Sequence, residues 1–82
     1  MKLEILTPDK TIFDGEVTSV TVPGTAGSLE ILKDNAPIIS TLEDGKVIVR
    51  GSNKLENEFL IKGGVVEVLH NKIMVLAEGV KQ

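Results

Sequence analysis

Residues 22–37, V-P-G-T-A-G-S-L-E-I-L-K-D-N-A-P, separate segments that have the composition of β-strands. Pro23-Gly24 is expected to end the first strand, because proline has no N–H to donate to a sheet and glycine tolerates positive φ. Leu29, Ile31 and Lys33 then alternate with Glu30 and Leu32 as in a short strand. Asn35-Ala36-Pro37 is expected to end this strand. A long, glycine-containing loop in a small domain is either a functional segment or a plain connection between strands.

The rest of the chain alternates short β-type segments with turn signals and has no amphipathic helical pattern. Glu43-Asp44-Gly45-Lys46 is the strongest hairpin signal, and Asp14-Gly15 is expected to form a hairpin or a bulge. We therefore predict an all-β fold for a single domain, residues 1–82, with no C-terminal helical hairpin. It should be a β-sandwich or flattened barrel of about eight to ten short, mostly antiparallel strands.

Three further turn signals divide the second half of the chain. Gly51-Ser52-Asn53-Lys54 and His70-Asn71-Lys72 should reverse its direction, and Gly63-Gly64 should let the backbone bend. Residues 65–69 and 73–77, which flank His70, are apolar on nearly both faces. One face can enter the core, and the other must be covered either within the domain or by another protein. The sequence leaves these two possibilities open.

Composition limits the classes of function. Without cysteine the chain can form neither a disulfide nor a thiolate metal site. No apolar run approaches the roughly 20 residues needed to span a bilayer, so we expect no direct insertion into a membrane. A net charge of −3 and only two aromatic residues provide neither a basic surface nor a stacking platform, so no nucleic-acid partner is expected.

The polar residues do not indicate catalysis or ligand binding. His70 is the only histidine and lies in a predicted turn, and no serine has the context of a nucleophile elbow. Residues 24–28 lack the Gly-Lys-Ser/Thr ending of a phosphate-binding loop, and the carboxylates lack calcium-loop spacing. We therefore predict no catalytic residue, no metal, no cofactor and no small-molecule ligand.

The chain contains four motifs in a definite order: Phe13-Asp14-Gly15, residues 20–24, residues 27–37, and residues 62–68 followed by Val75-Leu76-Ala77-Glu78. In this order and at this spacing they resemble the ε subunit of F-type ATP synthases. No single motif is specific, but the set covers nearly the whole chain. The sequence departs from the family pattern at Glu30, Lys33 and Asn35, where the family often has Gly, Pro and His.

The resemblance implies a non-catalytic rotor subunit of the central stalk, which links the γ subunit to the c ring and couples proton translocation to ATP synthesis. It implies a peripheral location on the cytoplasmic face of the bacterial inner membrane, or the organelle equivalent. Contact with the c ring is implied for Gly27, Ser28, Glu30, Asp34 and Asn35. Contact with γ is implied for Asn35, Ile38, Ile39 and Ser40, with the surplus apolar face of residues 65–77 as a weaker candidate.

Longer members of that family continue into two helices that can restrain ATP hydrolysis. Here only Gly79-Val80-Lys81-Gln82 follow the last motif, and about 12–15 residues are needed for even a marginal isolated helix. The resemblance therefore implies a subunit without the helical inhibitory arm.

Two alternative functions also fit a small all-β chain. Lipoyl and biotinyl carrier domains bear a modified lysine at a hairpin tip, and Lys46 follows the Asp44-Gly45 turn signal. Those domains place the lysine directly after Asp or between methionines, whereas Gly45 intervenes here. The second alternative is a β-sandwich interaction module with a different partner.

Overall fold

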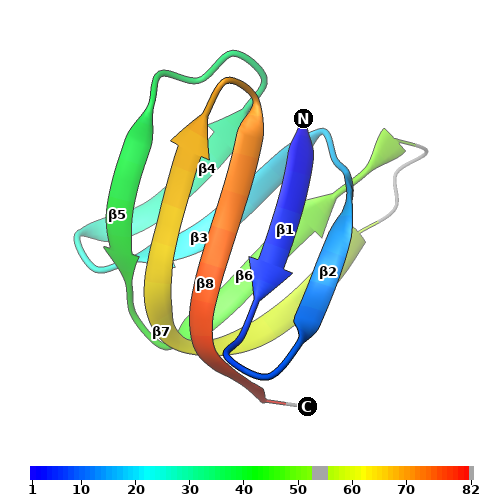
Figure 1. Cartoon of the computed structure of the whole chain (residues 1–82). Helices are drawn as coiled ribbons and strands as arrows, with labels where there is room; N and C mark the ends of the chain where they lie inside the picture. The colour runs from blue at the N-terminus through cyan, green and yellow to red at the C-terminus, as the bar shows by residue number, and fades with distance from the viewer. Residues whose placement is uncertain (53–55, 82) are drawn as a thin grey trace.

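A computed structural model describes residues 1–52 and 56–81 of the chain (Figure 1). These residues form eight strands: β1 (Lys2–Leu6), β2 (Thr11–Glu16), β3 (Ser19–Gly24), β4 (Gly27–Leu32), β5 (Ile38–Leu42), β6 (Gly45–Arg50), β7 (Glu56–Leu69) and β8 (Lys72–Lys81). Within the same residues there is no α-helix. The prediction of an all-β fold is confirmed.

The strands form two layers that share the long strand β7 (Figure 1). The front sheet has the order β2-β1-β8-β7-β5, and the back sheet has the order β4-β3-β6-β7. Residues 64–68 of β7 pair with β5, whereas residues 56–61 pair with β6. A pair between Gly24 and Leu42 also connects β3 to β5, so the two layers close into a flattened barrel.

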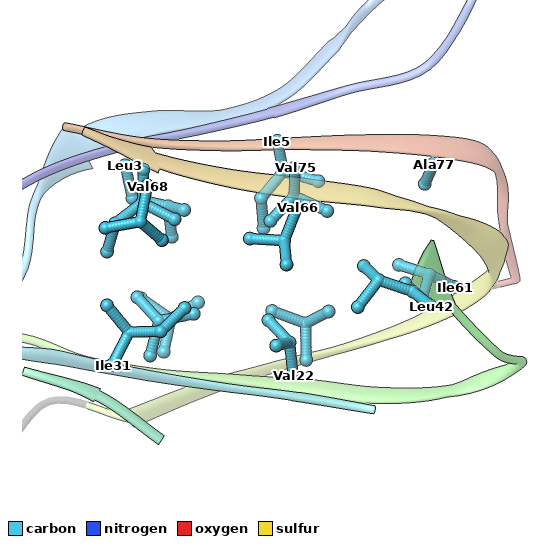
Figure 2. Close-up of a cluster of buried hydrophobic side chains, with 14 of the residues drawn as sticks. Leu3, Ile5, Val22, Ile31, Leu42, Ile61, Val66, Val68, Val75 and Ala77 are labelled. Carbon is cyan, nitrogen blue, oxygen red and sulfur yellow. The ribbon is translucent and has the colours of Figure 1, made fainter. Parts of the chain in front are cut away.

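The core lies between the two sheets and consists of aliphatic side chains that alternate inward along the strands. Figure 2 shows five side chains of the front sheet, Leu3, Ile5, Val66, Val68 and Val75, above Val22 and Ile31 of the back sheet. Ile31 is the only fully buried residue of β4, so it anchors that edge strand to the core. Leu42 and Ile61 fill the end of the core where β7 passes from one sheet to the other.

The bend predicted at Gly63-Gly64 is confirmed and has a clear geometric cause. Both glycines have positive φ, 45° and 136°, which other residues rarely adopt. They lie between the part of β7 that pairs with β6 and the part that pairs with β5. The bend therefore carries one strand through both layers.

The predicted turn at His70-Asn71 is also confirmed, because both residues have positive φ and lie between β7 and β8. Part of the predicted Gly51-Ser52-Asn53-Lys54 turn lies outside the described residues, so this turn stays a prediction.

Residues 22–37 are more regular than their composition indicates. β3 does not end before Pro23 but continues through Gly24, and Thr25-Ala26 turn the chain into β4. The ladder between β3 and β6 covers residues 19–21 only, so the missing N–H of Pro23 falls beyond its end. Most of the expected long loop is thus a β-hairpin, and the strand predicted over residues 29–33 is its second arm.

Two turn predictions were wrong. Asp14-Gly15 lies inside β2, paired with Glu4 and Leu3 of β1. Asp44-Gly45 does not form a hairpin, because β5 pairs with β7 and β3 whereas β6 pairs with β3 and β7. Gly45 is not among the residues with positive φ, which a type I′ turn would need. Glu43-Asp44 instead connect the front sheet to the back sheet.

The Asp44 carboxylate stabilises this connection, because its Oδ1 accepts a hydrogen bond of 2.9 Å from the backbone N–H of Gly63. We expect Asp44→Ala to lower the free energy of unfolding by about 1 kcal/mol, the usual net value of such a bond. Asp44→Asn keeps an acceptor oxygen and should cost less. Urea denaturation of both variants measures the difference, and equal losses would show that the bond does not contribute.

Candidate partner interface

The outer face of the front sheet is unusually apolar. Ile39 of β5 is 77% exposed and Leu76 of β8 is 48% exposed, and Val65 and Leu69 of β7 are exposed as well. The strand registers place Val65 beside Leu76, and Leu76 beside Leu6 of β1. We call these five residues and the half-buried Met74 of β8 the front apolar face.

An open groove of about 640 Å³ lies at the end of this face where β7 bends at Gly63-Gly64. Its lining includes Leu6, Pro8, Val65 and Leu76, together with the glycines of the β7 bend. Glu67 lies in the next row of the sheet, between Ile39 and Met74. The front sheet thus presents a shallow apolar surface with the Glu67 carboxylate inside it and the Glu4–Lys72 ion pair on its β1 side, which suits contact with another protein.

The outer face of the back sheet has a different chemistry. Arg50 Nε lies 3.1 Å from Glu56 Oε1, and Arg50 Nη1 lies 3.9 Å from Glu30 Oε2. Lys46 Nζ lies 3.6 Å from Glu58 Oε1. Exposed pairs of this kind contribute only about 0–1 kcal/mol each, and they are typical of a solvated surface.

The structure separates the residues for which the resemblance implies contact with γ. Ile38 is partly buried and packs against the core, whereas Ile39 points away from it and joins the front apolar face. Ser40 is half-buried, and its hydroxyl donates to the carbonyl of Thr41. The sequence offered two separate candidates for the γ contact, the segment that contains Ile39 and the surplus apolar face of residues 65–77. In the structure Ile39 and this face form one surface.

The residues for which contact with the c ring is implied are spread along β4. Gly27 and Ser28 are exposed at the tip of the β3–β4 hairpin, and Glu30 lies on the back sheet with Arg50. Asp34 and Asn35 lie beyond the other end of β4, which at roughly 3.3 Å per residue is about 17 Å from the tip. These residues therefore make two separate groups.

The β3–β4 tip is fixed to the front sheet. The Thr25 N–H donates to the carbonyl of Thr41 at 3.0 Å, and the two threonine hydroxyls lie 2.7 Å apart. The N–H of Glu43 also donates to the carbonyl of Pro23 at 2.9 Å. The tip is thus held in one position relative to β5.

Two residues of the candidate partner interface, Leu6 and Asn71, were not identified from the sequence. Leu6 joins the front apolar face, and it was detectable because Leu3 and Ile5 point inward and Leu6 is out of phase with them. Asn71 bonds to Asp34 across 37 positions of the chain, and no local pattern reveals such a contact.

The carrier alternative requires Lys46 at a hairpin tip, and the structure contradicts this. Lys46 lies inside β6, paired with Leu60 of β7, and not at a hairpin tip. His70 is exposed at the β7–β8 turn. Across residues 1–52 and 56–81, no three His, Cys, Asp or Glu side chains are grouped so that they could hold a metal ion. In the same part of the chain, no helix has the length and apolarity to cross a membrane.

Comparisons with known proteins agree on one family. Residues 1–82 match the family model described as ATP synthase, Delta/Epsilon chain, beta-sandwich domain. The chain is 48% identical to an ATP synthase epsilon chain of Chlorobium limicola, over 96% of this chain and 90% of that protein. It is 43% identical to the epsilon chain of Sulfurimonas denitrificans, over 96% of this chain but only 61% of that protein.

Two solved assemblies contain chains with the same fold. One is the OSCP/F1/c-ring part of the Euglena gracilis mitochondrial ATP synthase, with a TM-score of 0.89 at 18% identity over 96% of this chain and 51% of that one. The other is the central stalk and c ring of the Tetrahymena thermophila mitochondrial ATP synthase, with a TM-score of 0.82 at 24% identity. The second match covers 99% of this chain and 65% of that one, so this chain spans half to two thirds of each neighbour.

Proposed function

This chain belongs to the family of ATP synthase delta/epsilon chains, and we propose that it is a non-catalytic subunit of the central stalk of an F-type ATP synthase. It links the γ subunit to the c ring and helps to couple proton translocation to ATP synthesis. Residues 1–82 act as one β-sandwich domain. The complex holds it as a peripheral subunit on the cytoplasmic face of the bacterial inner membrane, or at the organelle equivalent.

The front apolar face carries this proposal, and we assign it to γ. Ile39, Val65 and Leu76 expose apolar surface that only a partner would remove from water, at roughly 25 cal/mol per Å² of apolar area buried. Glu67 lies inside this surface and is available for a basic group of γ. Among the described residues, the charged back sheet exposes only the separate side chains of Leu32 and Leu60 as large apolar groups, which supports one orientation of the subunit.

The hairpin tip at Gly27 and Ser28 is assigned to the c ring. It is exposed, yet its hydrogen bonds to β5 hold it at a fixed distance from the front apolar face. A stiff unit with separate surfaces for γ and the c ring suits the transmission of torque, since the two partners must keep one relative geometry. Asp34 and Asn35 lie beyond the other end of β4, where Asp34 bonds to Asn71 in the turn that follows Leu69, and we assign this corner to the border of the γ surface.

Complex formation tests the proposed function. The chain should co-purify in equal amounts with γ, and the pair should then bind the c ring. A chain that binds neither partner in the presence of the complete complex would contradict the proposal. Measurement of the intact mass addresses the carrier alternative, since a lipoyl or biotinyl group on Lys46 would add its mass.

Cysteine cross-linking tests the orientation. Ser28→Cys and Asp34→Cys are a matched pair, because both positions are exposed and lie at opposite ends of β4. In the assembled complex we expect Ser28→Cys to cross-link with a cysteine in the polar loop of the c subunit. Asp34→Cys should cross-link mainly with γ. The reverse pattern would overturn the assignment of the two surfaces.

A further inference from the structure

The corner that connects β4 to β5 is tied to the β7–β8 turn by a reciprocal pair of hydrogen bonds. The backbone N–H of Asp34 donates to Asn71 Oδ1 at 2.7 Å, and Asn71 Nδ2 donates to Asp34 Oδ1 at 3.0 Å. We call this pair the Asp34–Asn71 clasp. In Figure 1 the two turns lie at the same end of the molecule, where the chain passes from the back sheet to the front sheet.

Each side of the clasp is itself held in place. The Asn71 carbonyl accepts a bond of 3.0 Å from the N–H of Lys2, which fixes the turn to β1. On the other side, Asn35 Oδ1 accepts from the N–H of Leu32 at 2.8 Å, which closes the corner on itself. The clasp therefore joins the β4–β5 corner, which is closed by its own hydrogen bonds, to the turn between the two central strands of the front sheet, β7 and β8.

The clasp also accounts for an unusual backbone conformation. Asp34 and Asn71 have φ of 64° and 60°, a region that asparagine and aspartate adopt more readily than most residues. Their short side chains then reach a neighbouring backbone group. Asparagine and aspartate therefore both fit positions that require a positive φ and a short side chain that can form a hydrogen bond to the other turn.

We propose that Asn71 is a positioning residue for partner binding, because it sets the place of the Asp34–Asn35 corner relative to the front apolar face. This proposal rests on the proposed function, in which that corner borders the γ surface. Asn71 acts through Asp34, and the clasp keeps the corner ordered before γ arrives. Order that exists before binding does not have to be created at the interface, which improves affinity.

Four variants test the clasp in the free protein. Asn71→Gly keeps the positive φ but removes both bonds, so the amide of residue 34 should exchange about tenfold faster with solvent. Asn71→Asp places two carboxylates together and should also speed exchange. Asp34→Asn keeps an acceptor for Asn71 Nδ2, and it should exchange like the wild type. The double variant Asp34→Asn/Asn71→Asp reverses the amide and the carboxylate, and it should restore the protection that Asn71→Asp loses.

Unchanged exchange in Asn71→Gly, or no rescue in the double variant, would overturn the proposal. Binding to γ is the second measurement: Asn71→Gly should weaken it about threefold to tenfold, and the double variant should recover it. If the clasp behaves as expected but γ affinity is equal in all variants, the positioning role is wrong while the proposed function stands. If the wild type does not bind γ, the proposed function fails, and the exchange data still decide whether Asn71 orders the corner.

Discussion

Replacement of Leu76 by glutamate should weaken binding to γ by about a hundredfold or more, because a carboxylate that is buried without a partner costs several kcal/mol. Leu76 lies in the centre of the front apolar face, beside Val65 on β7 and Leu6 on β1. In the free chain it is 48% exposed, so glutamate can remain in water and the fold should be retained. Calorimetric titration of γ with the variant measures the loss.

Leu60→Glu is the matched control. Leu60 is 43% exposed, nearly as much as Leu76, but it lies on the back sheet between Lys46 and Lys81. A glutamate there stays in water and meets two lysines, so neither the stability nor the affinity for γ should fall. An equal loss of γ affinity in both variants would show that the front apolar face is not the specific docking surface. Thermal unfolding of each variant confirms that it is folded.

The sequence predicted the composition of this surface but not its exposure. Residues 65–69 and 73–77 are apolar on nearly both faces, which left open whether the second face was covered within the domain. The topology decides this, because β7 and β8 lie in the middle of the front sheet and nothing in residues 1–52 and 56–81 packs over their outer side. Whether a strand face is exposed depends on which other elements pack against it. The alternation of apolar and polar residues along one strand does not reveal those neighbours.

Local residue types correctly predicted the turns in which the backbone conformation itself restricts the choice of residue. Gly63-Gly64 and His70-Asn71 have positive φ, so the residue types alone indicated a bend and a turn. The hairpin predicted at Asp44-Gly45 was wrong because the strands on either side, β5 and β6, pair with other strands and not with each other. Long-range strand pairing thus outweighed the local preference of Asp-Gly for a hairpin turn. The Asp34–Asn71 clasp was missed for the same reason. The proposed γ surface was thus partly predictable, through Ile39 and residues 65–77, and its positioning residue was not.

Gly64→Ala should lower the free energy of unfolding by about 3–4 kcal/mol or more, a large part of the total for a domain of this size. The glycine has φ of 136°, and a Cβ at this position would overlap the carbonyl oxygen of Leu76 on β8. That oxygen belongs to β8, whose residues 72–77 pair with residues 64–69 of β7, so it cannot move without opening this ladder. The loss should appear in urea denaturation as a lower midpoint.

Gly27→Ala distinguishes the cost of the positive φ from the cost of the overlap with β8. Gly27 has φ of 134°, almost the same as Gly64, but a Cβ added there would meet nothing within 4 Å. Its substitution should therefore show only the cost of the backbone conformation, about 1–2 kcal/mol. The excess loss in Gly64→Ala is then the cost of separating β7 from β8 at the bend. Equal losses in the two variants would show that β8 can yield, and that the close approach of the strands at Gly64 does not stabilise the passage of β7 between the sheets.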